Sequence, residues 1–504
     1  MQQRTIEYVI IILIILYVTV FILGLSFINP TGYMTGDSSN YLRLSGRILD
    51  GHGFFLPSDG REGAVDRWFA KWPVGYPVLI SGVAWILGVS TFLASKILNI
   101  FLLSSAILGL YIVLGQRGLI ASFVLLTAST SRIYTMTWSE APFLTALVIL
   151  CLYLGKIVNG NFKVNNQNLV ILFSLLILPF LFRYVGLFVI APTFLVAIYL
   201  FFQGRKRESI LTLIVIFFSL IFCLIYLLNN LKLNGYATGM PRLTALEENH
   251  ILLISLIKSI FLEFILIIPS WDIKNVIQNI VVATWILFAL FCWVLITKNT
   301  RQRDEASNSN TFSYLFMMFG LIYLCAIIFL RWVSNFNELG FSYRQLSPGF
   351  ALFFIGFCLW VLELNKERYN SLVIFAFVTV FFVAVGNFYS IISKHGLGTN
   401  YLTHIDRMHK KYAKLPDNAV VIFGERELKY LRPNIRIASP KIAHDLTHNE
   451  TWDNFLLNLD VTSQIFVETG HRSRKLNSYH ESVKNAINAL PADKIVQIEK
   501  PTQK

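Results

Sequence analysis

The chain has 504 residues, of which 55% are hydrophobic and 14% are charged, and its mean hydropathy is +0.59. A soluble protein of this size is less apolar, so the composition predicts a protein of the lipid bilayer. Lys and Arg exceed Asp and Glu by 43 − 29 = 14, but much of this excess lies in short tracts between apolar runs, which argues against nucleic-acid binding.

About eleven apolar runs are candidates to cross a hydrocarbon core about 30 Å thick, for which a helix needs about 20 residues. They lie near residues 6–28, 91–114, 118–136, 139–157, 168–182, 184–203, 209–231, 276–297, 311–332, 346–364 and 370–391. The first run is too long for a signal-peptide core and no small-residue cleavage site follows it, so we expect a retained helix. The expected fold class is an all-α polytopic membrane protein.

Basic residues in alternate connections predict the orientation of these helices. Arg117, Lys156 and Lys163, the tract 205–207, and further Lys and Arg residues near 298–303 and 366–368 occupy every second connection. The first connection, residues 29–90, is long and mixed in sign. We therefore expect a multi-pass protein of the plasma (inner) membrane with a cytoplasmic N-terminus, and with this loop and the C-terminal tail on the extracytoplasmic side.

The first outer loop contains two candidate functional segments. Residues 35–41 open a helical pattern in which Asp37 lies at or beside the helix N-terminus, where a carboxylate is also an ordinary N-cap worth about 1 kcal/mol. The loop closes on residues 70–77, where Lys71 lies among Trp and Tyr side chains at headgroup depth. Lys and Trp are also common membrane-interface anchors, so both segments have a structural as well as a functional interpretation.

Three further charges lie at the outer ends of predicted spans. Glu140 follows Ser139 at the start of the fourth span, where it suits the positive end of the helix dipole. Arg183 and Arg344 occur at outer ends, where the positive-inside tendency disfavours a cation. Charges kept at such a depth are functional candidates.

The tail differs abruptly in composition from the rest of the chain. It is polar, with short apolar segments at 420–423, 435–438, 465–467 and 494–498 and helix-like stretches between them, which predicts a small α/β domain over residues 392–504 after a transmembrane domain over 1–391. The histidines of the tail lack a spacing that indicates zinc. The five cysteines all lie in apolar runs, so no disulfide framework is expected.

Together these segments resemble a known family. Asp37 after the first span, the Lys71-x-Pro73-x-Gly75-Tyr76 segment, Ser139-Glu140, the Arg183-Tyr-x-Gly186 element and the Tyr343-Arg344-x-Leu346-x-Pro348 element occur in this order. They look like membrane glycosyltransferases of the GT-C fold, above all the bacterial relatives of dolichyl-phosphate-mannose protein mannosyltransferases and lipid A aminoarabinose transferases.

The resemblance implies an inverting glycosyltransferase that moves a hexose or pentose from a polyprenyl-phosphate carrier to an envelope acceptor, which would be a lipid, a glycan or a protein. It implies that Lys71, Arg183 and Arg344 bind the donor phosphate and that Asp37 acts as the base. Glu140 would be a supporting or metal-binding carboxylate. The aromatic residues nearest these charges are expected to line the substrate pocket, namely Tyr41, Trp72, Tyr76 and Tyr343.

Metal use stays open, because Ser38 follows Asp37 where the family often has a second acidic residue. Asp37 and Glu140 are the carboxylates that a divalent metal would use, and no other cofactor is implied. A multi-pass transporter or a flippase of lipid-linked saccharides is the main alternative function. Against a transporter, no internal repeat is evident and the charges gather at one face rather than at the midplane.

Overall fold

A computed structural model of the protein describes residues 2–57, 66–160, 165–239, 249–266, 311–333, 343–364, 400–416, 419–422, 427–438, 465–468 and 495–498. The expected spans at 276–297 and 370–391 lie outside these residues. The described part of the chain separates into two compact units. The first, which we call the bundle unit, holds the residues up to Ser26, the segment Ala70–Tyr76 and the described residues from 96 to 364. The second, the tail unit, holds residues 27–69, 77–95 and the described residues from 400 onward.

Seven helices in the described residues are long and apolar enough to cross a membrane. They include α1 (Gln2–Ile28), α4 (Thr91–Leu114), α7 (Glu140–Val158), α10 (Lys206–Asn234), α13 (Thr311–Val333) and α14 (Tyr343–Leu364), and the seventh joins the 3-10 helix η2 (Tyr184–Val189) to α9 (Ile190–Phe202). The shorter α8 (Asn166–Phe182) and α11 (Asn249–Leu266) accompany them, and α11 was not expected from the sequence.

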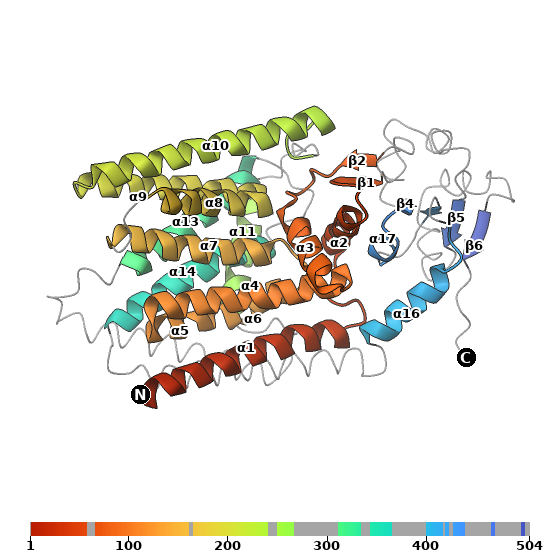
Figure 1. The fold of residues 1–504 in the computed structure, drawn as a ribbon, viewed down its shortest axis with the longest axis horizontal. Coiled ribbons are helices and arrows are strands. Elements are labelled where there is room, and N and C mark those ends of the chain that lie inside the picture. Colours follow the sequence, from red (N-terminus) through yellow and green to blue (C-terminus); the bar gives the residue numbers. More distant parts are fainter. Residues whose placement is uncertain are drawn as a thin grey trace. The chain divides into compact units, whose positions relative to one another are not determined.

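Helix α7 is the central helix of the bundle unit. Among the seven, it has the largest buried share of its apolar stretch, 78%, whereas α10 has 28%. It packs against α8 and α13, as Figure 1 shows. Gly155 of α7 meets the ring of Phe312, which would lie 2.2 Å from an added Cβ, so α7 and α13 approach closely where a glycine replaces a side chain. The residues at the two ends of α7 are therefore attached to a helix that the core of the bundle unit holds in place.

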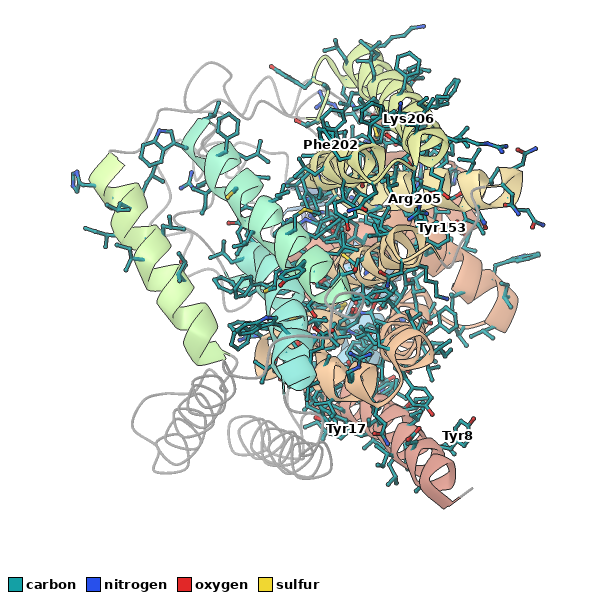
Figure 2. The ribbon with its side chains drawn as sticks, turned by 90° about the vertical axis from the view of Figure 1, so that its left-hand side faces the viewer. Tyr8, Tyr17, Tyr153, Phe202, Arg205 and Lys206 are labelled. Carbon is teal, nitrogen blue, oxygen red and sulfur yellow. The ribbon has the colours of Figure 1, made fainter. Side chains whose placement is uncertain are left out.

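Arg205 caps the C-terminal end of α7, whereas Glu140 lies at its N-terminal end. It donates to the carbonyls of Ile157 and Val158 at 2.8 and 2.7 Å and pairs with Glu208. These carbonyls are among those that the last helical turn leaves without an intrahelical partner. Figure 2 views this end of the bundle unit, with Arg205 and Tyr153 labelled.

One expected helix is wrong as a continuous element. The run 118–136 forms α5 (Gln116–Ser122), the 3-10 helix η1 (Phe123–Leu126) and α6 (Ala128–Thr135). The chain breaks at Thr127, whose φ of −64° and ψ of 160° are extended. Its hydroxyl donates to the Val124 carbonyl at 2.8 Å, a local bond that competes with helix continuation. Apolar composition alone does not reveal this competition.

The tail unit contains α2 (Gly36–Leu49), the hairpin of β1 (Phe55–Pro57) and β2 (Asp66–Trp68), and α3 (Gly75–Leu87) from Pro77 onward. It also holds α16 (Tyr401–Tyr412), α17 (Leu428–Leu431), and a parallel sheet in the order β4-β3-β5-β6. The strands are β3 (Val420–Ile422), β4 (Arg436–Ala438), β5 (Ile465–Glu468) and β6 (Ile495–Ile498), and they lie at the four apolar segments noted in the sequence.

A compact apolar cluster joins α16, α17 and the start of the sheet. It consists of Met408, Tyr412, Leu415, Ala419, Val421, Leu428 and Ile435. The hydroxyls of Tyr401 and Tyr430 lie 3.2 Å apart, and burial raises the pKa of both phenols, so both stay neutral at physiological pH. The two short helices are therefore tied to each other by apolar and polar contacts.

Candidate functional site

Glu140 is the first residue of α7 and is fully buried. Ser139, the residue before it, has helical φ and ψ, and its side chain does not cap the helix. A carboxylate in a first turn faces the positive end of the helix dipole, but this accounts for only a small part of the free energy needed to bury a charge. Glu140 therefore requires cationic partners.

Arg183 and Arg344 supply those partners. Nη1 of Arg183 lies 2.6 Å from Oε1 of Glu140. The two atoms form an ion pair, but their angles do not meet the geometry of a hydrogen bond. Nε of Arg344 donates to the same oxygen, and its Nη2 donates to Oε2 at 3.3 Å. Two guanidinium groups therefore surround one carboxylate, and the cluster has a net charge of 2 − 1 = +1. A surplus positive charge in a water-poor site attracts an anion.

The two arginines lie at different helix ends: Arg183 follows the last residue of α8, and Arg344 lies at the start of α14. Arg183 is extended between α8 and η2, with φ −149° and ψ 135°. Gly186 makes this break compact, because a Cβ there would lie 2.2 Å from the backbone of Pro179. Arg344 lies in the first turn of α14, where a cation is disfavoured by the helix dipole. The carboxylate of Glu140 offsets that repulsion.

Aromatic rings flank the two guanidinium groups. Arg344 lies over the ring of Trp138 at 4.5 Å, and Arg183 lies 5.9 Å from the centroid of Phe143. Both distances fall within the range of a cation–π contact. The ring of Tyr323 packs on Phe143 at 5.6 Å, and its hydroxyl donates to the carbonyl of Gln345 at 2.8 Å. These contacts limit the rotation of both arginines while leaving 19% of Arg183 and 16% of Arg344 exposed.

Lys71 is held in the bundle unit by the residue next to Arg183. The hydroxyl of Tyr184 donates to the carbonyl of Ala70 at 2.7 Å and accepts from Nδ2 of Asn230 at 3.0 Å. Gly239 approaches the same backbone so closely that a Cβ would lie 2.6 Å from the nitrogen of Lys71. The Lys71 ammonium lies over the ring of Trp72 at 4.6 Å. The segment of the third expected phosphate-binding residue is thus anchored by Tyr184, which directly follows Arg183 in the chain.

Sequence reasoning missed Tyr184, Asn230 and Gly239 as anchors of this segment. It also missed Lys96 and Asn99 of α4, which are fully buried. Lys96 donates to the carbonyl of Thr135 at 2.7 Å, and Asn99 donates to those of Tyr134 and Met136 at 2.8 Å. Two polar residues three positions apart in an apolar helix are the sequence signal for such a contact. They fix the chain that leads from α6 to Trp138 and Glu140.

Asp37 lies in the tail unit, in the first turn of α2 and half-buried. Its interpretation as the N-cap is wrong, because Thr35 is the N-cap and its hydroxyl accepts from the nitrogen of Ser38 at 3.3 Å. Asp37 is thus not required to cap the helix. Its role as a base stays a prediction.

The four aromatic residues expected in the substrate pocket have different environments. Tyr41 and Tyr76 are fully buried. Tyr41 meets Phe69 edge-on at 6.5 Å, and the Tyr76 hydroxyl donates to Oδ1 of Asn99 at 3.0 Å. Trp72 supports Lys71, and the side chain of Tyr343 lies outside the described residues. Their role in a pocket stays a prediction.

A divalent metal does not fit at Glu140. Both of its carboxylate oxygens already face guanidinium groups, and a cation there would meet two positive charges. Within the described residues, no three His, Cys, Asp or Glu side chains gather as a metal site requires. The surroundings of Glu140 therefore suit a counter-ion of the two arginines and not a metal ligand.

Neither the protein-family models nor the curated proteins include a match to this sequence. Among solved structures, ArnT from Cupriavidus metallidurans bound to undecaprenyl phosphate matches with a TM-score of 0.53 at 10% identity, over 98% of this chain and 90% of that one. The oligosaccharyltransferase of Archaeoglobus fulgidus tethered to an acceptor peptide matches with a TM-score of 0.44 at 14% identity, over 86% of this chain.

The archaeal oligosaccharyltransferase AglB from the same organism, in complex with an inhibitory peptide and a dolichol-phosphate, has a TM-score of 0.47 at 12% identity, over 86% of this chain and 64% of that one. This chain likewise spans 64% of the length of the peptide-tethered oligosaccharyltransferase. The match to ArnT shows the class: the protein is a polytopic membrane protein with the GT-C fold.

Proposed function

We propose that this protein is an inverting glycosyltransferase that moves a sugar from a polyprenyl-phosphate carrier to an envelope acceptor at the extracytoplasmic face of the membrane. The observation that carries the proposal is the buried cluster of Glu140, Arg183 and Arg344, with its net positive charge and flanking aromatic rings. ArnT, which has the same fold, was solved with undecaprenyl phosphate bound. An anionic lipid phosphate is the ligand that such a cluster would bind.

In the proposed reaction, Asp37 takes the proton from the acceptor hydroxyl while its oxygen attacks the anomeric carbon. A bond forms between this oxygen and the anomeric carbon as the bond to the phosphate oxygen breaks, and the configuration inverts. The electron pair leaves with the polyprenyl phosphate, whose charge Arg183, Arg344 and Lys71 neutralise. A positioned base contributes roughly 10²- to 10⁴-fold to the rate. Glu140 holds the two arginines next to each other and oriented, because its carboxylate offsets their mutual repulsion.

The proposal includes the finer topology expected from the sequence. The chain crosses the membrane about eleven times, as the apolar runs predict. The N-terminus is cytoplasmic, and residues 392–504 form an extracytoplasmic α/β domain. The short parallel strands β3 and β4 and the cluster around Met408 and Val421 support this part of the proposal.

The test combines two measurements on the full chain. Mass spectrometry of envelope lipids, glycans and proteins, with and without this protein, would identify the transferred sugar and its acceptor. Binding of undecaprenyl phosphate to the purified protein tests the cationic cluster separately. Binding of the lipid without any difference in envelope products would favour the flippase alternative.

Asp37→Asn should abolish the product while binding of undecaprenyl phosphate persists, because the amide cannot accept the proton. Asp50→Asn is the matched control, since Asp50 is the exposed C-cap of the same helix. Near-normal product with Asp37→Asn would remove this residue from the chemistry.

Arg344→Ala should weaken binding of undecaprenyl phosphate or slow transfer at least tenfold, as expected for a charge-assisted contact worth about 1.5 kcal/mol or more. Arg205→Ala is the control, because Arg205 also pairs with a glutamate but lies at the other end of α7, about 28 Å away for 19 residues at 1.5 Å each. Equal effects of the two variants would assign Arg344 to packing.

A further inference from the structure

Arg43 and Arg47 lie one helical turn apart on the same face of α2, and 4% and 5% of them are exposed. Neither was a candidate from the sequence. A buried guanidinium must have its donors satisfied, because leaving a charge unpaired in a dry environment is strongly unfavourable. The partners of these two residues therefore show what α2 is built to contact.

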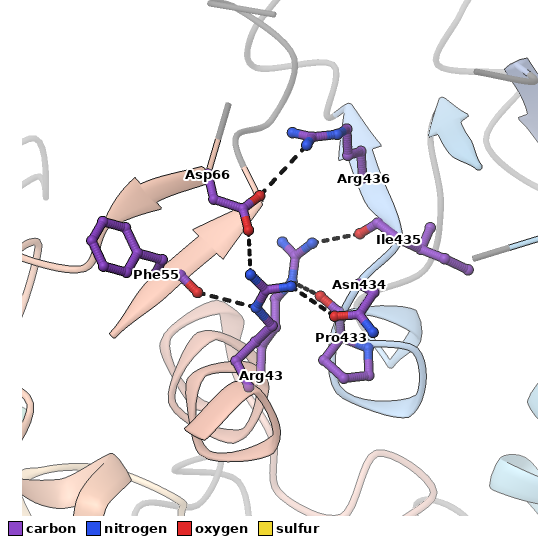
Figure 3. A network of polar contacts seen from close by, with 8 residues as sticks. Arg43, Phe55, Asp66, Pro433, Asn434, Ile435 and Arg436 are labelled. Atoms are coloured by element: carbon purple, nitrogen blue, oxygen red, sulfur yellow. Dashed lines mark hydrogen bonds and ion pairs between the residues drawn. The ribbon is translucent and has the colours of Figure 1, made fainter. Parts of the chain in front are cut away.

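The partners of Arg43 lie in the turn of residues 433–435, almost 400 residues away in the sequence (Figure 3). Its Nε donates to the carbonyl of Pro433 at 2.8 Å, and its Nη2 donates to the carbonyl of Ile435. Gly46, on the next turn of α2, packs on the Pro433 ring, which lies 3.4 Å from an ideal Cβ at Gly46. Polar and apolar contacts thus join one helix face to one turn.

Arg47 extends the same network to the first loop. Its Nη1 donates to Oδ1 of Asn434 at 2.8 Å, its Nε donates to the carbonyl of Phe55 at 3.1 Å, and its Nη2 pairs with Asp66. Arg436 reaches the other oxygen of Asp66 at 3.5 Å, as Figure 3 shows. One network of hydrogen bonds and ion pairs therefore connects the turn, the β1–β2 hairpin and α2.

A second, separate contact holds the chain just ahead of α2. The ring of Tyr401, at the start of α16, stacks on Phe92 at 3.9 Å. Gly32 fits against both rings, with each within 2.8 Å of an ideal Cβ, and its φ is +58°. Tyr33 follows with a φ of 54°, a conformation that a non-glycine residue adopts only where its surroundings enforce it. The tail thus fixes both ends of the segment that contains Asp37.

We propose that the C-terminal tail is a positioning element for Asp37: the turn of residues 433–435, clamped by Arg43 and Arg47, holds α2 in the orientation that presents this carboxylate. The proposal rests on the function proposed above for its chemical consequence. The clamp itself does not depend on that function.

Hydrogen exchange tests the clamp directly. In the full-length protein, Arg43→Met should speed exchange of the α2 amides at least tenfold, because two carbonyls of the turn lose their donor. Arg407→Met is the control, since Arg407 is an exposed arginine of the same unit. If Arg43→Met does not fold, Asn434→Ala removes one acceptor of Arg47 at an exposed position and should give a smaller change in the same amides. Unchanged α2 protection in the folded variant would overturn the clamp.

An engineered disulfide provides a rescue experiment. An ideal Cβ at Gly46 lies 3.6 Å from Cβ of Pro433, which is within the separation that a disulfide spans. Gly46→Cys with Pro433→Cys, oxidised, should restore slow exchange of α2 in the Arg43→Met background, and reduction should remove the rescue. Failure of the oxidised protein to regain protection would count against the clamp.

The effect of the clamp on the proposed reaction is measured in the same variants by the amount of envelope product and by binding of undecaprenyl phosphate. Arg43→Met should lower product formation at least tenfold and leave binding of undecaprenyl phosphate within twofold, and the oxidised disulfide should restore the product. Loosened α2 with normal product would overturn the positioning role. If the wild-type protein formed no envelope product, the proposed function would be wrong. Hydrogen exchange of α2 would still show whether the clamp exists.

Discussion

At the scale of single residues, the central feature is one buried carboxylate shared by two arginines. Glu140 is fully buried, whereas Arg183 and Arg344 each keep one partly exposed side. Such a triad does not stabilise the fold as much as apolar packing would, because desolvation offsets most of the attraction. The anionic lipid phosphate that we propose as the ligand would complete the charge balance of this triad.

Glu140→Gln should lower the free energy of unfolding by about 3–5 kcal/mol, because it leaves two largely desolvated cations, only 19% and 16% exposed, without a counter-charge. Thermal unfolding in detergent micelles would measure it. Glu208→Gln is the control: this glutamate pairs with Arg205 at a site where both side chains are 24% exposed, so about 1 kcal/mol or less is expected. Equal shifts in the two variants would contradict the interpretation of the buried triad.

Tyr184→Phe should weaken binding of undecaprenyl phosphate about fivefold, because one hydrogen bond of about 1 kcal/mol no longer holds the Ala70 carbonyl and the adjacent Lys71. Tyr153→Phe removes the same kind of bond, to the carbonyl of Asn168 at 2.9 Å, at the end of the bundle unit shown in Figure 2. Binding isotherms of both variants would check this. A similar loss in Tyr153→Phe would mean that Tyr184 contributes only general stability.

At the scale of elements, the site depends on places where helices stop. Arg183 is available because α8 ends and η2 begins, and Glu140 follows the broken run of α5, η1 and α6. Glycine lets the backbones near these elements approach closely. At Gly186, after the end of α8, a Cβ would meet the backbone of Pro179, and at Gly118 of α5 it would lie 2.0 Å from the carbonyl oxygen of Leu110 in α4. The approach of one backbone to another is possible only without a side chain.

Gly186→Ala should destabilise the protein by at least about 1–3 kcal/mol, because the added methyl group forces η2 away from α8. Binding of undecaprenyl phosphate should fall as well, since Arg183 moves with η2. Gly82→Ala is the control, because nothing lies within 4 Å of its Cβ in α3, and it should be neutral or stabilise by up to about 1 kcal/mol. Thermal unfolding and binding of undecaprenyl phosphate, measured for both variants, check this prediction. Equal effects of Gly186→Ala and Gly82→Ala would contradict it.

At the scale of the whole molecule, the pattern of basic residues predicts which ends of the helices face the cytoplasm. The connection at 205–207 is expected inside and the tail outside. Both regions offer exposed positions for labelling: Gln203 lies beside the basic connection, and Leu402 of α16 is 61% exposed. The native cysteines all lie in apolar runs, which keeps the labelling background low.

In intact cells, a membrane-impermeant maleimide should label Leu402→Cys but not Gln203→Cys. Permeabilised cells should show labelling of both, and the unmodified chain measures the background. The opposite pattern would invert the orientation and place the proposed chemistry in the cytoplasm, which would contradict transfer at the extracytoplasmic face.

The sequence by itself determined the class of protein and the candidate charges. Apolar runs predicted the long helices, because a helix that faces lipid needs uniform hydrophobicity over its whole length. Glu140, Arg183 and Arg344 were detectable because a charge at the end of a span is unfavourable unless something requires it. The short apolar segments of the tail also coincide with the positions of β3–β6.

Only the tertiary structure decided how these residues pair. That both arginines meet Glu140, that Tyr184 anchors the segment of Lys71, and that Arg43 and Arg47 bind a turn of the tail are contacts between residues far apart in the chain. Such pairing depends on how helices and loops pack, and hydrophobic periodicity carries no information about it. The break at Thr127 was missed for a different reason, since a local hydroxyl contact outweighed an apolar pattern that favoured one helix.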